Sequence, residues 1–263
     1  DESTGAHKLF ALNAASGDRT IDLSDEKAEA MQTRLTYELR AYHTAAWGDH
    51  QTSLTAVLNA MESTSSEPQK FLEAVEHRNL GFSMRGTYGF KDRYFVEASF
   101  GYNGSERFAK KHKMGFFPAA GVAYVISSEP FMAGAANWLP YLKFRASYGK
   151  VGNDGIINTP RFVHLPEVLA TSVRSLQPGQ QDAKAWTVRN YADENIKWEI
   201  AEQVNFGLEA KMFKGIMEFT LDAYQEIRHN ILSYRLVIPS HVGIEQNQLD
   251  NIGKVRSRGI DFS

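Results

Sequence analysis

The sequence is notable first for what it lacks. It contains no cysteine, which excludes a disulfide framework and fits a cytosolic protein as well as one that faces an oxidising periplasm. No stretch approaches the roughly 18–20 consecutive apolar residues of a transmembrane helix. Membrane β-strands are not excluded by that absence, because they are apolar only at every second position. The 29 basic and 31 acidic residues leave a formal charge of -2, so no basic excess indicates a nucleic-acid partner.

The short motifs of common enzyme sites are also absent. The eight histidines include no H-x-x-x-H or H-E-x-x-H pair, so no zinc site is indicated. No G-x-S-x-G, phosphate-binding P-loop or G-x-G-x-x-G pattern occurs. The stretch VGNDGI at 151–156 carries a single aspartate, which favours a turn over a calcium loop. We therefore expect no catalytic residue, no metal, no cofactor and no enzymatic activity.

Long alternating runs are what the sequence does contain, most clearly at residues 81–104, GFSMRGTYGF-KDRY-FVEASFGYNG. One face of an extended chain would carry Phe82, Met84, Gly86, Tyr88 and Phe90 and, after the turn, Tyr94, Val96, Ala98, Phe100 and Tyr102. Because successive side chains of a strand point to opposite faces, this pattern predicts a β-hairpin with one apolar and one polar face.

The same alternation recurs along the chain. Further runs fall at about 31–41, 54–60, 120–126, 142–148, 198–212 and 217–223, with a last one starting near Arg256. We expect about nine strands, or ten if HKLFALNA at 7–14 adds one.

Strand length and loop length together indicate an architecture. The runs reach the roughly 9–11 residues of a membrane-spanning strand, whereas strands of soluble proteins centre on about 5–6. Short connections around 44–50, 91–93, 127–139 and 213–215 alternate with long ones around 62–80, 103–114, 149–196 and 229–253. Outer-membrane barrels show this alternation of short periplasmic turns and long extracellular loops. The sequence thus predicts an all-β fold, the antiparallel wall of a transmembrane barrel; a soluble antiparallel sheet or β-sandwich is the alternative, since its strands alternate too.

Aromatic residues near the short turns agree with a membrane interface. Phe90 and Tyr94 bracket one turn and Tyr42 and Trp47 another, as expected for a girdle of amphipathic rings. Glu202 is the exception in an otherwise apolar row. Because it falls near the outer end of its strand, we expect it at or above the lipid headgroups.

Four phrases, in order, carry a family resemblance. The first is GFSMRGTYGFKDRYFVEASFGYNGSERFAKKHKMGFFPAAGVAYVISSEPFM, and the others are LPYLKFRASYGKVGNDGI, IKWEIAEQVNFGLEAKMFKG and NIGKVRSRGIDF. From about residue 31 to the end, the sequence resembles the barrel of the SusC/RagA-like family of TonB-dependent outer-membrane transporters. It departs from the family pattern at Arg258 and at 201–203, neither of which bears on a functional site.

The resemblance implies a larger protein. Members of this family carry a signal peptide, a plug domain, a motif that engages TonB and a barrel closed by 22 strands. We expect residues 1–263 to be part of the barrel domain, with the plug domain, the signal peptide and the remaining strands encoded elsewhere. The first residue is not methionine and the last run stops within its alternation, which agrees with a piece of a longer chain.

The implied function is energised import of large nutrients, either oligosaccharides or peptides, across the outer membrane of a Gram-negative bacterium of the Bacteroidota type. The implied partners are a SusD-like surface lipoprotein that acts as a lid, TonB acting through the missing N-terminal part, outer-membrane lipid and the substrate. Two functions with the same architecture stay open: a TonB-dependent siderophore or vitamin receptor, and a passive porin. A soluble carbohydrate-binding β-sandwich is a third alternative.

Candidate functional residues fall in two groups. The long connection 149–196 carries aromatic and basic residues suited to stacking on a substrate and binding it, namely Trp186, Tyr191, Arg161 and Arg189; packing within the loop or against the lid is the plainer interpretation. The polar strand faces carry Arg85, Glu97, Arg145, Glu209 and Asp222. These five are expected to face the lumen or the plug, or to form ordinary polar wall.

Overall fold

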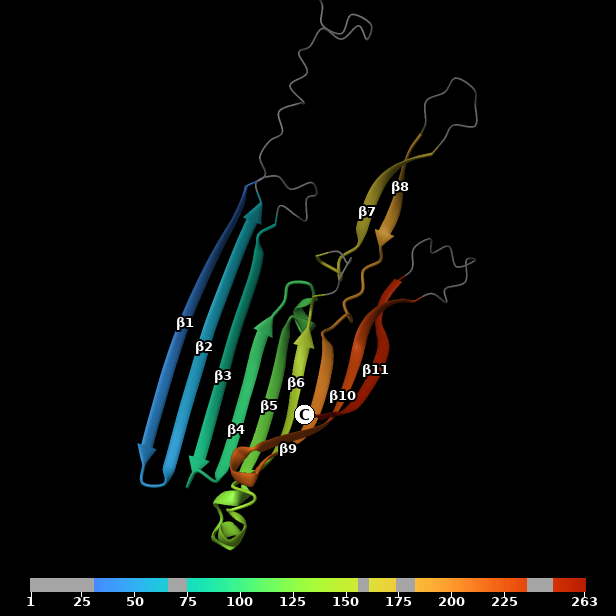
Figure 1. Cartoon of the computed structure of the whole chain (residues 1–263). Helices are drawn as coiled ribbons and strands as arrows, with labels where there is room; N and C mark the ends of the chain where they lie inside the picture. Colours follow the sequence, from blue (N-terminus) through green and yellow to red (C-terminus); the bar gives the residue numbers. More distant parts are fainter. Residues whose placement is uncertain (1–30, 66–74, 156–160, 174–182, 236–247) are drawn as a thin grey trace, which may run out of the picture.

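The computed structural model describes residues 31–65, 75–155, 161–173, 183–235 and 248–263. HKLFALNA at 7–14, the possible tenth strand, lies outside these ranges. Nine strands form one antiparallel sheet (Figure 1). They are β1 (Gln32–Trp47), β2 (His50–Ser65), β3 (His77–Phe90), β4 (Tyr94–Gly104), β5 (Met114–Val125), β6 (Tyr141–Asn153), β9 (Glu199–Met212), β10 (Met217–Arg235) and β11 (Gln248–Phe262).

Every strand of this sheet pairs with its neighbours in chain order, except that β6 pairs with β9 across a separate hairpin. That hairpin, β7 (Glu167–Val173) with β8 (Ala183–Asn190), extends beyond the loop end of the sheet (Figure 1). The nine predicted strands are confirmed, and the alternative of a β-sandwich is wrong. Among the described residues, the only other sheet is the two-stranded β7–β8 hairpin, so no second sheet covers the first as a sandwich requires.

Tight turns join β1 to β2, β3 to β4 and β9 to β10 at one end of the sheet, the turn end, and the other end is the loop end (Figure 1). The connection 126–140 also lies at the turn end, but it carries the 3-10 segments η3 (Ile126–Ser128) and η4 (Pro130–Ala135). The prediction of a short connection there was therefore wrong, since it is longer than the loop-end connection 105–113. The turn between β3 and β4 has positive φ at both central residues, 54° at Lys91 and 53° at Asp92. The Arg93 amide donates to the Phe90 carbonyl at 3.1 Å. These are the features of a type I′ turn, whose twist matches that of the flanking strands.

Several predicted boundaries were wrong, and the large errors gave strands that are too short. The first turn is confined to residues 48–49, and β2 continues to Ser65. β10 runs to Arg235, and β11 begins at Gln248 rather than near Arg256. The connection 149–196 contains the β7–β8 hairpin, which was not predicted. Where a strand extends past the apolar part of its face, apolar and polar residues no longer alternate in the sequence, although the backbone hydrogen bonds continue. The sequence pattern therefore underestimates the length of such strands.

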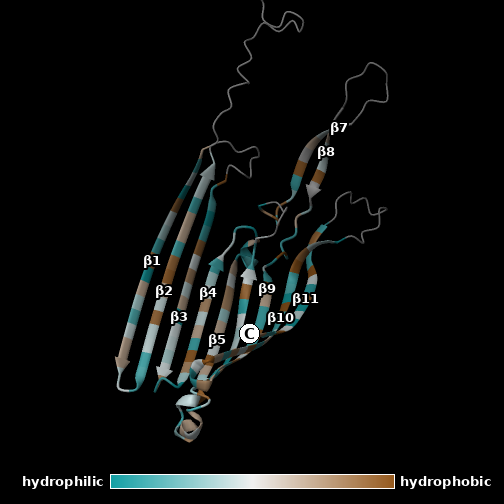
Figure 2. Cartoon of the chain, in the orientation of Figure 1, coloured by the Kyte–Doolittle hydropathy of each residue, from teal (hydrophilic) through white to brown (hydrophobic). Residues whose placement is uncertain are grey.

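The registers place every predicted apolar row on one face of the curled sheet, the convex face. Figure 2 shows hydrophobic and hydrophilic residues interspersed along its strands. This convex face carries, for example, Val96 opposite Val122, and Phe144 opposite Leu208. The opposite, concave face carries charged pairs in the strand interiors, such as Arg85 with Glu97 and Arg145 with Asp222. Glu202 lies on the convex face near the loop end, where its carboxylate pairs with Lys150 Nζ at 2.8 Å and His229 Nε2 at 3.4 Å; its predicted place at the headgroups stays a prediction.

An aromatic row crosses the convex face at the turn end. Ring centroids are 5.6 Å apart for Trp47 and His50, 4.9 Å for His50 and Phe90, and 5.0 Å for the stacked pair Tyr94 and Tyr124. Tyr42, predicted to belong to this row, lies on the concave face instead. Tyr42 is paired with Thr55, which is next to Leu54 on β2. Leu54 is on the convex face, and neighbouring residues of a strand point to opposite faces.

A second aromatic row crosses the convex face toward the loop end. Phe82 and Phe100 have ring centroids 5.8 Å apart, and Phe100 and Phe116 have theirs 5.5 Å apart. Phe82 and Phe90 on β3 are about 26 Å apart along the strand, at about 3.3 Å per residue. A tilt of about 40° reduces this to roughly 20 Å across the sheet, close to the apolar band of a transmembrane barrel.

The strands β5 and β6 separate toward the loop end. Near the turn end they are paired, from Val125 with Lys143 to Ala119 with Gly149. Pro118, the next residue of β5 toward the loop end, has no partner on β6. Proline has no amide hydrogen for a ladder, so it fits where a pairing ends. On its other side, β5 remains paired with β4 as far as Met114.

Beyond this separation lies the main buried cluster, formed by Phe108, Val163, Ile196, Trp198, Leu232 and Leu249 with Phe117 and Ile200 packed against it. The Trp198 ring lies 5.3 Å from that of Phe108 and 5.2 Å from that of Phe117. Its indole Nε1 donates to the His112 carbonyl at 3.1 Å. The cluster thus joins the 105–113 and 161–166 connections to the loop-end parts of β9, β10 and β11.

Candidate functional site

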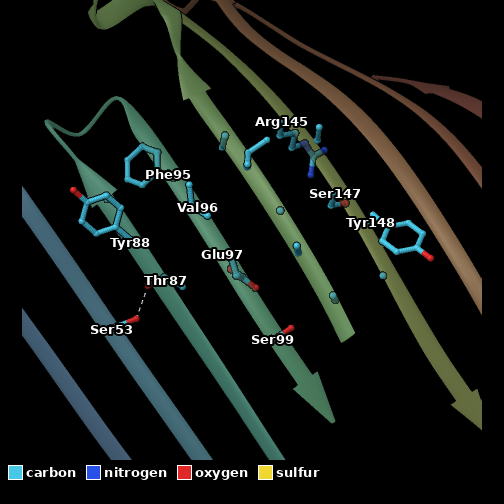
Figure 3. A pocket seen from close by; sticks show the side chains of 18 of the residues that line it. Ser53, Thr87, Tyr88, Phe95, Val96, Glu97, Ser99, Arg145, Ser147 and Tyr148 are labelled. Atoms are coloured by element: carbon cyan, nitrogen blue, oxygen red, sulfur yellow. Dashed lines mark hydrogen bonds between the residues drawn. The ribbon is translucent and has the colours of Figure 1, made fainter. Parts of the chain in front are cut away.

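The concave face holds a depression of about 1050 Å³. Mostly short side chains from β1 to β6 and from β9 line it, including Ser53, Thr87, Ser99 and Ser147 (Figure 3). Ser53 and Thr87 share a hydrogen bond of 2.5 Å between their hydroxyl groups. Small polar side chains leave space and keep the surface wet, as a wall facing an aqueous lumen requires.

Two of the predicted wall residues, Arg85 and Glu97, form one ion pair, and Glu97 lines this depression. Arg85 donates from Nε at 2.9 Å and from Nη2 at 2.7 Å to the two oxygens of Glu97. Arg85 on β3 and Glu97 on β4 lie two positions out of direct register, within reach of long side chains on one face. Both are well exposed, so the pair contributes about 0–1 kcal/mol to stability.

The other three, Arg145, Glu209 and Asp222, form a second group across β6, β9 and β10. Arg145 Nη2 donates to both oxygens of Asp222, at 2.8 and 2.6 Å. Arg145 Nε lies 3.3 Å from Glu209, whose carboxylate is also 3.6 Å from Lys143 Nζ. The sequence identified the charged residues of this wall; the structure adds that they pair with one another.

Gly207 makes the pair between Arg145 and Asp222 possible. It is in direct register with both, between them on β9. A Cβ at Gly207 would lie 2.3 Å from Arg145 Nε and 2.8 Å from Asp222 Oδ1. Without a side chain there, the guanidinium lies flat across β9 and does not project into the lumen.

Gly207→Ala is therefore expected to displace the pair and lower the free energy of unfolding by about 1–3 kcal/mol, the usual cost of overpacking. Denaturant unfolding of the full-length protein would measure the loss. Gly121→Ala is the matched control, because its Cβ would meet only ordinary contacts at 3.6 Å and strand glycine is itself unfavourable. Equal stability of the two variants would contradict the bridging role of Gly207.

A third group at the loop end centres on the half-buried Glu106. Arg161 donates from Nε to the Glu106 carboxylate and from Nη2 to the Glu76 carbonyl at 2.6 Å. His77 Nδ1 also contacts this carboxylate, and the Arg78 amide donates to it at 3.2 Å. Burial by itself would raise the pKa of Glu106, but the hydrogen bonds from Arg161, His77 and Arg78 outweigh it and hold the pKa below its ordinary value.

This lowered pKa predicts an acid-sensitive attachment of the 161–166 connection. A carboxylate with a depressed pKa stabilises fully above its unfolded value, about 4.3, and loses that contribution as the pH falls through the folded value. Glu106→Gln should lower stability by roughly 1–3 kcal/mol at pH 7, and the difference from wild type should shrink as the pH falls below about 4.3 toward the folded value. Thermal unfolding of the full-length protein from pH 3 to 7 would test this, with the exposed Glu194→Gln as control; a difference independent of pH would contradict it.

The four predicted loop residues do not gather at one place. Trp186 lies on β8 and is 73% exposed, the largest exposed ring of the hairpin. Arg189 follows in the same strand and Tyr191 just after it. Arg161 is engaged by Glu106 and two carbonyls, so it anchors a loop, and its role toward a substrate stays a prediction, as does that of the other three.

Sequence reasoning missed Glu106 and Phe108, which organise the loop end. A single phenylalanine in the basic stretch 105–113 was the available signal, because an isolated ring among charged residues is usually buried. A second hollow of about 850 Å³ lies beside them, lined by Arg78, Lys110, Lys113, His164 and others. Across the described ranges, no group of three or more histidine, aspartate or glutamate side chains could hold a metal ion. None of the helices that the structure describes has the length and apolarity to cross a membrane.

Comparisons with known proteins agree with this geometry. TonB-dependent receptor P3 of Formosa agariphila is 28% identical over 201 residues, covering 76% of this chain and 19% of the relative. TonB-dependent receptor SusC of Bacteroides thetaiotaomicron is 26% identical over 190 residues, covering 72% of this chain and 18% of the relative. This chain thus spans about a fifth of the length of these curated relatives.

Solved structures share the fold. The RagAB peptide transporter matches with a TM-score of 0.70 at 20% identity, covering 89% of this chain and 27% of the other. The siderophore receptor PirA of Pseudomonas aeruginosa matches with a TM-score of 0.54 at 13% identity, covering 89% and 39%. The family described as TonB dependent receptor-like, beta-barrel, matches residues 4–263. Since that match covers nearly the whole chain, the protein belongs to the TonB-dependent receptor-like β-barrel family and is of the SusC/RagA type.

Proposed function

We propose that this chain forms part of the barrel wall of an outer-membrane importer of large nutrients, either oligosaccharides or peptides. The nine-stranded sheet, apolar on its convex face and charged on its concave face, is the observation that supports this most directly. A sheet of nine strands cannot close around a plug in lipid without leaving an unpaired edge. The remaining strands, the plug domain and the signal peptide would therefore be encoded outside residues 1–263.

The proposed working cycle needs two partners. A SusD-like surface lipoprotein would cover the loop end, where β7–β8 projects, and TonB would displace the plug from the periplasmic side. In that arrangement the exposed Trp186 lies in a connection close to the lid, and the charged groups around Arg85 and Arg145 face the plug or the pathway. The relatives in Formosa and Bacteroides support a Bacteroidota-type host.

The experiment is to purify the full-length protein from outer membranes in mild detergent and identify co-purifying proteins by mass spectrometry. A stoichiometric surface lipoprotein is the expected result, and its own binding specificity would indicate whether glycan or peptide is carried. A barrel purified alone would favour the siderophore or vitamin receptor, to which the fold of PirA is also similar. Recovery without detergent would contradict membrane placement.

A plug domain upstream separates either transporter from a passive porin. Sequencing the complete reading frame would answer this, because a porin of this architecture has no plug and needs no TonB. Trp186→Ala should then weaken substrate binding to the purified complex without lowering its stability, since the ring makes little buried contact.

A further inference from the structure

The convex face changes character toward the loop end of β11. Ile260 and Phe262 continue its apolar row, but the next residues on the same face are Lys254, Arg256 and Arg258. We call these three the basic row. All three are exposed, and alternation along the strand points them to the same side as Ile260.

The neighbouring strand offers this basic row no negative charge. Lys254, Arg256 and Arg258 are in direct register with His229, Ile227 and Gln225 of β10. Arg258 Nε donates to Gln225 Oε1 at 2.7 Å. Glu202 is the nearby carboxylate on this face of the described strands, and it is already paired with Lys150 and His229. Three cations in a line thus remain available to an outside anion.

The height of the basic row coincides with the edge of the apolar band. Gln225, opposite Arg258, lies about 26 Å from Met217 along β10, at about 3.3 Å per residue. The second aromatic row lies at the same distance from its own turn, as measured from Phe90 to Phe82. Arg256 and Lys254 continue for about another 13 Å beyond this level. The three charges therefore begin where the hydrocarbon would end.

We propose that the basic row binds the phosphate groups of glycolipids in the outer leaflet of the outer membrane. Guanidinium groups bind phosphate oxygens in bidentate fashion, and lysine adds a point charge on a flexible stem. Such long side chains cover apolar surface with their stems while their charged ends reach the headgroups. The proposal rests on the membrane placement given under "Proposed function", and it adds a lipid ligand on the outer surface, away from the lumen.

The test uses the full-length protein in detergent micelles and lipopolysaccharide as the probe, with binding followed by microscale thermophoresis. The double variant Lys254→Gln/Arg256→Gln removes two positive charges. Neither side chain makes a hydrogen bond within the described strands, so the substitutions break none there. The variant's binding of lipopolysaccharide should weaken about thirtyfold, as expected for two charges at an anionic surface. Binding of enzymatically dephosphorylated lipopolysaccharide should be weak in wild type and unchanged in the variant.

The matched control is Lys91→Asn/Lys214→Asn, which removes the same charge at the turn end. Asparagine is chosen because both backbones have positive φ, 54° and 59°, a conformation asparagine tolerates. Wild-type binding by the control supports the proposal. Equal weakening of both variants would overturn it, and so would unchanged binding by the Lys254/Arg256 variant. Binding of inorganic phosphate in the absence of any lipopolysaccharide binding would also overturn it. Heat-modifiable migration of the wild-type barrel reports membrane folding separately, so failure of the lipid site is distinguishable from failure of the proposed function.

Discussion

Trp198→Ala is expected to lower the free energy of unfolding by about 3–5 kcal/mol, the usual cost of removing a large buried ring. Trp198 is 8% exposed, and its ring packs between Phe108 and Phe117. Its loss would leave a cavity at the place where β5 and β6 no longer hold each other. The connection 105–113 would also lose the hydrogen bond that His112 accepts.

Denaturant unfolding of the full-length protein would measure this effect, and hydrogen exchange would locate it at the loop end. Trp198→Phe should cost less, because it keeps most of the packing and loses chiefly one hydrogen bond, about 1 kcal/mol. Trp186→Ala is the control, since the same substitution at a ring that is 73% exposed should be nearly neutral. If Trp198→Ala were as mild as Trp186→Ala, the cluster would not be what holds the loop end together.

Leu208→Arg is expected to cost about 2–4 kcal/mol, the price of a cation near the middle of a bilayer. Leu208 lies on the convex face between Phe144 and Leu221. It is about 13 Å from Met212 along β9, well inside the apolar band. An arginine there would face hydrocarbon with no partner within reach.

Heat-modifiable electrophoresis of outer membranes would report the folded fraction, and unfolding from lipid vesicles would give the free energy. Asn205→Arg is the matched control on the same strand, because Asn205 faces the wet concave side and should tolerate a charge within about 1 kcal/mol. Equal tolerance at Leu208 and Asn205 would mean that the convex face is not in lipid.

Local alternation was enough to predict the strands that lie within the apolar band. The turn between β3 and β4 was predicted to the residue, because both faces keep their character up to the tight turn at Lys91 and Asp92, although β3 begins at His77, four residues before the predicted run. β11 was predicted to start near Arg256, eight positions late, because its convex face turns basic where it leaves the band. The strands of the β7–β8 hairpin have only seven and eight residues, fewer than any strand of the large sheet, so they resembled loop.

The wall residues were identified by type, but their partners could not be. Arg145 and Asp222 are 77 positions apart, and they meet only because β6 pairs with β9 across the β7–β8 hairpin. Their pairing also depends on Gly207, which has no side chain to separate them. The sequence does not reveal that Gly207 lies between these two charges, because that depends on the register of β9 with β6 and β10. Glu106 and Arg161 are likewise joined by loop geometry that no period encodes.

The end of the β5–β6 pairing at Ala119 and Gly149 has a mechanical meaning. Toward the turn end, β5 and β6 are joined by a continuous ladder of backbone hydrogen bonds. Toward the loop end, each stays paired with its outer neighbour, and Phe117 on β5 packs against Trp198 of the buried cluster. The described wall therefore consists of two groups of strands, β1–β5 and β6 with β9–β11, that are hydrogen-bonded to each other only between Ala119 and Val125 of β5. A load on the loop-end parts of β5 and β6 would therefore pass through side-chain packing around Phe117, whereas between Ala119 and Val125 it would pass through backbone hydrogen bonds.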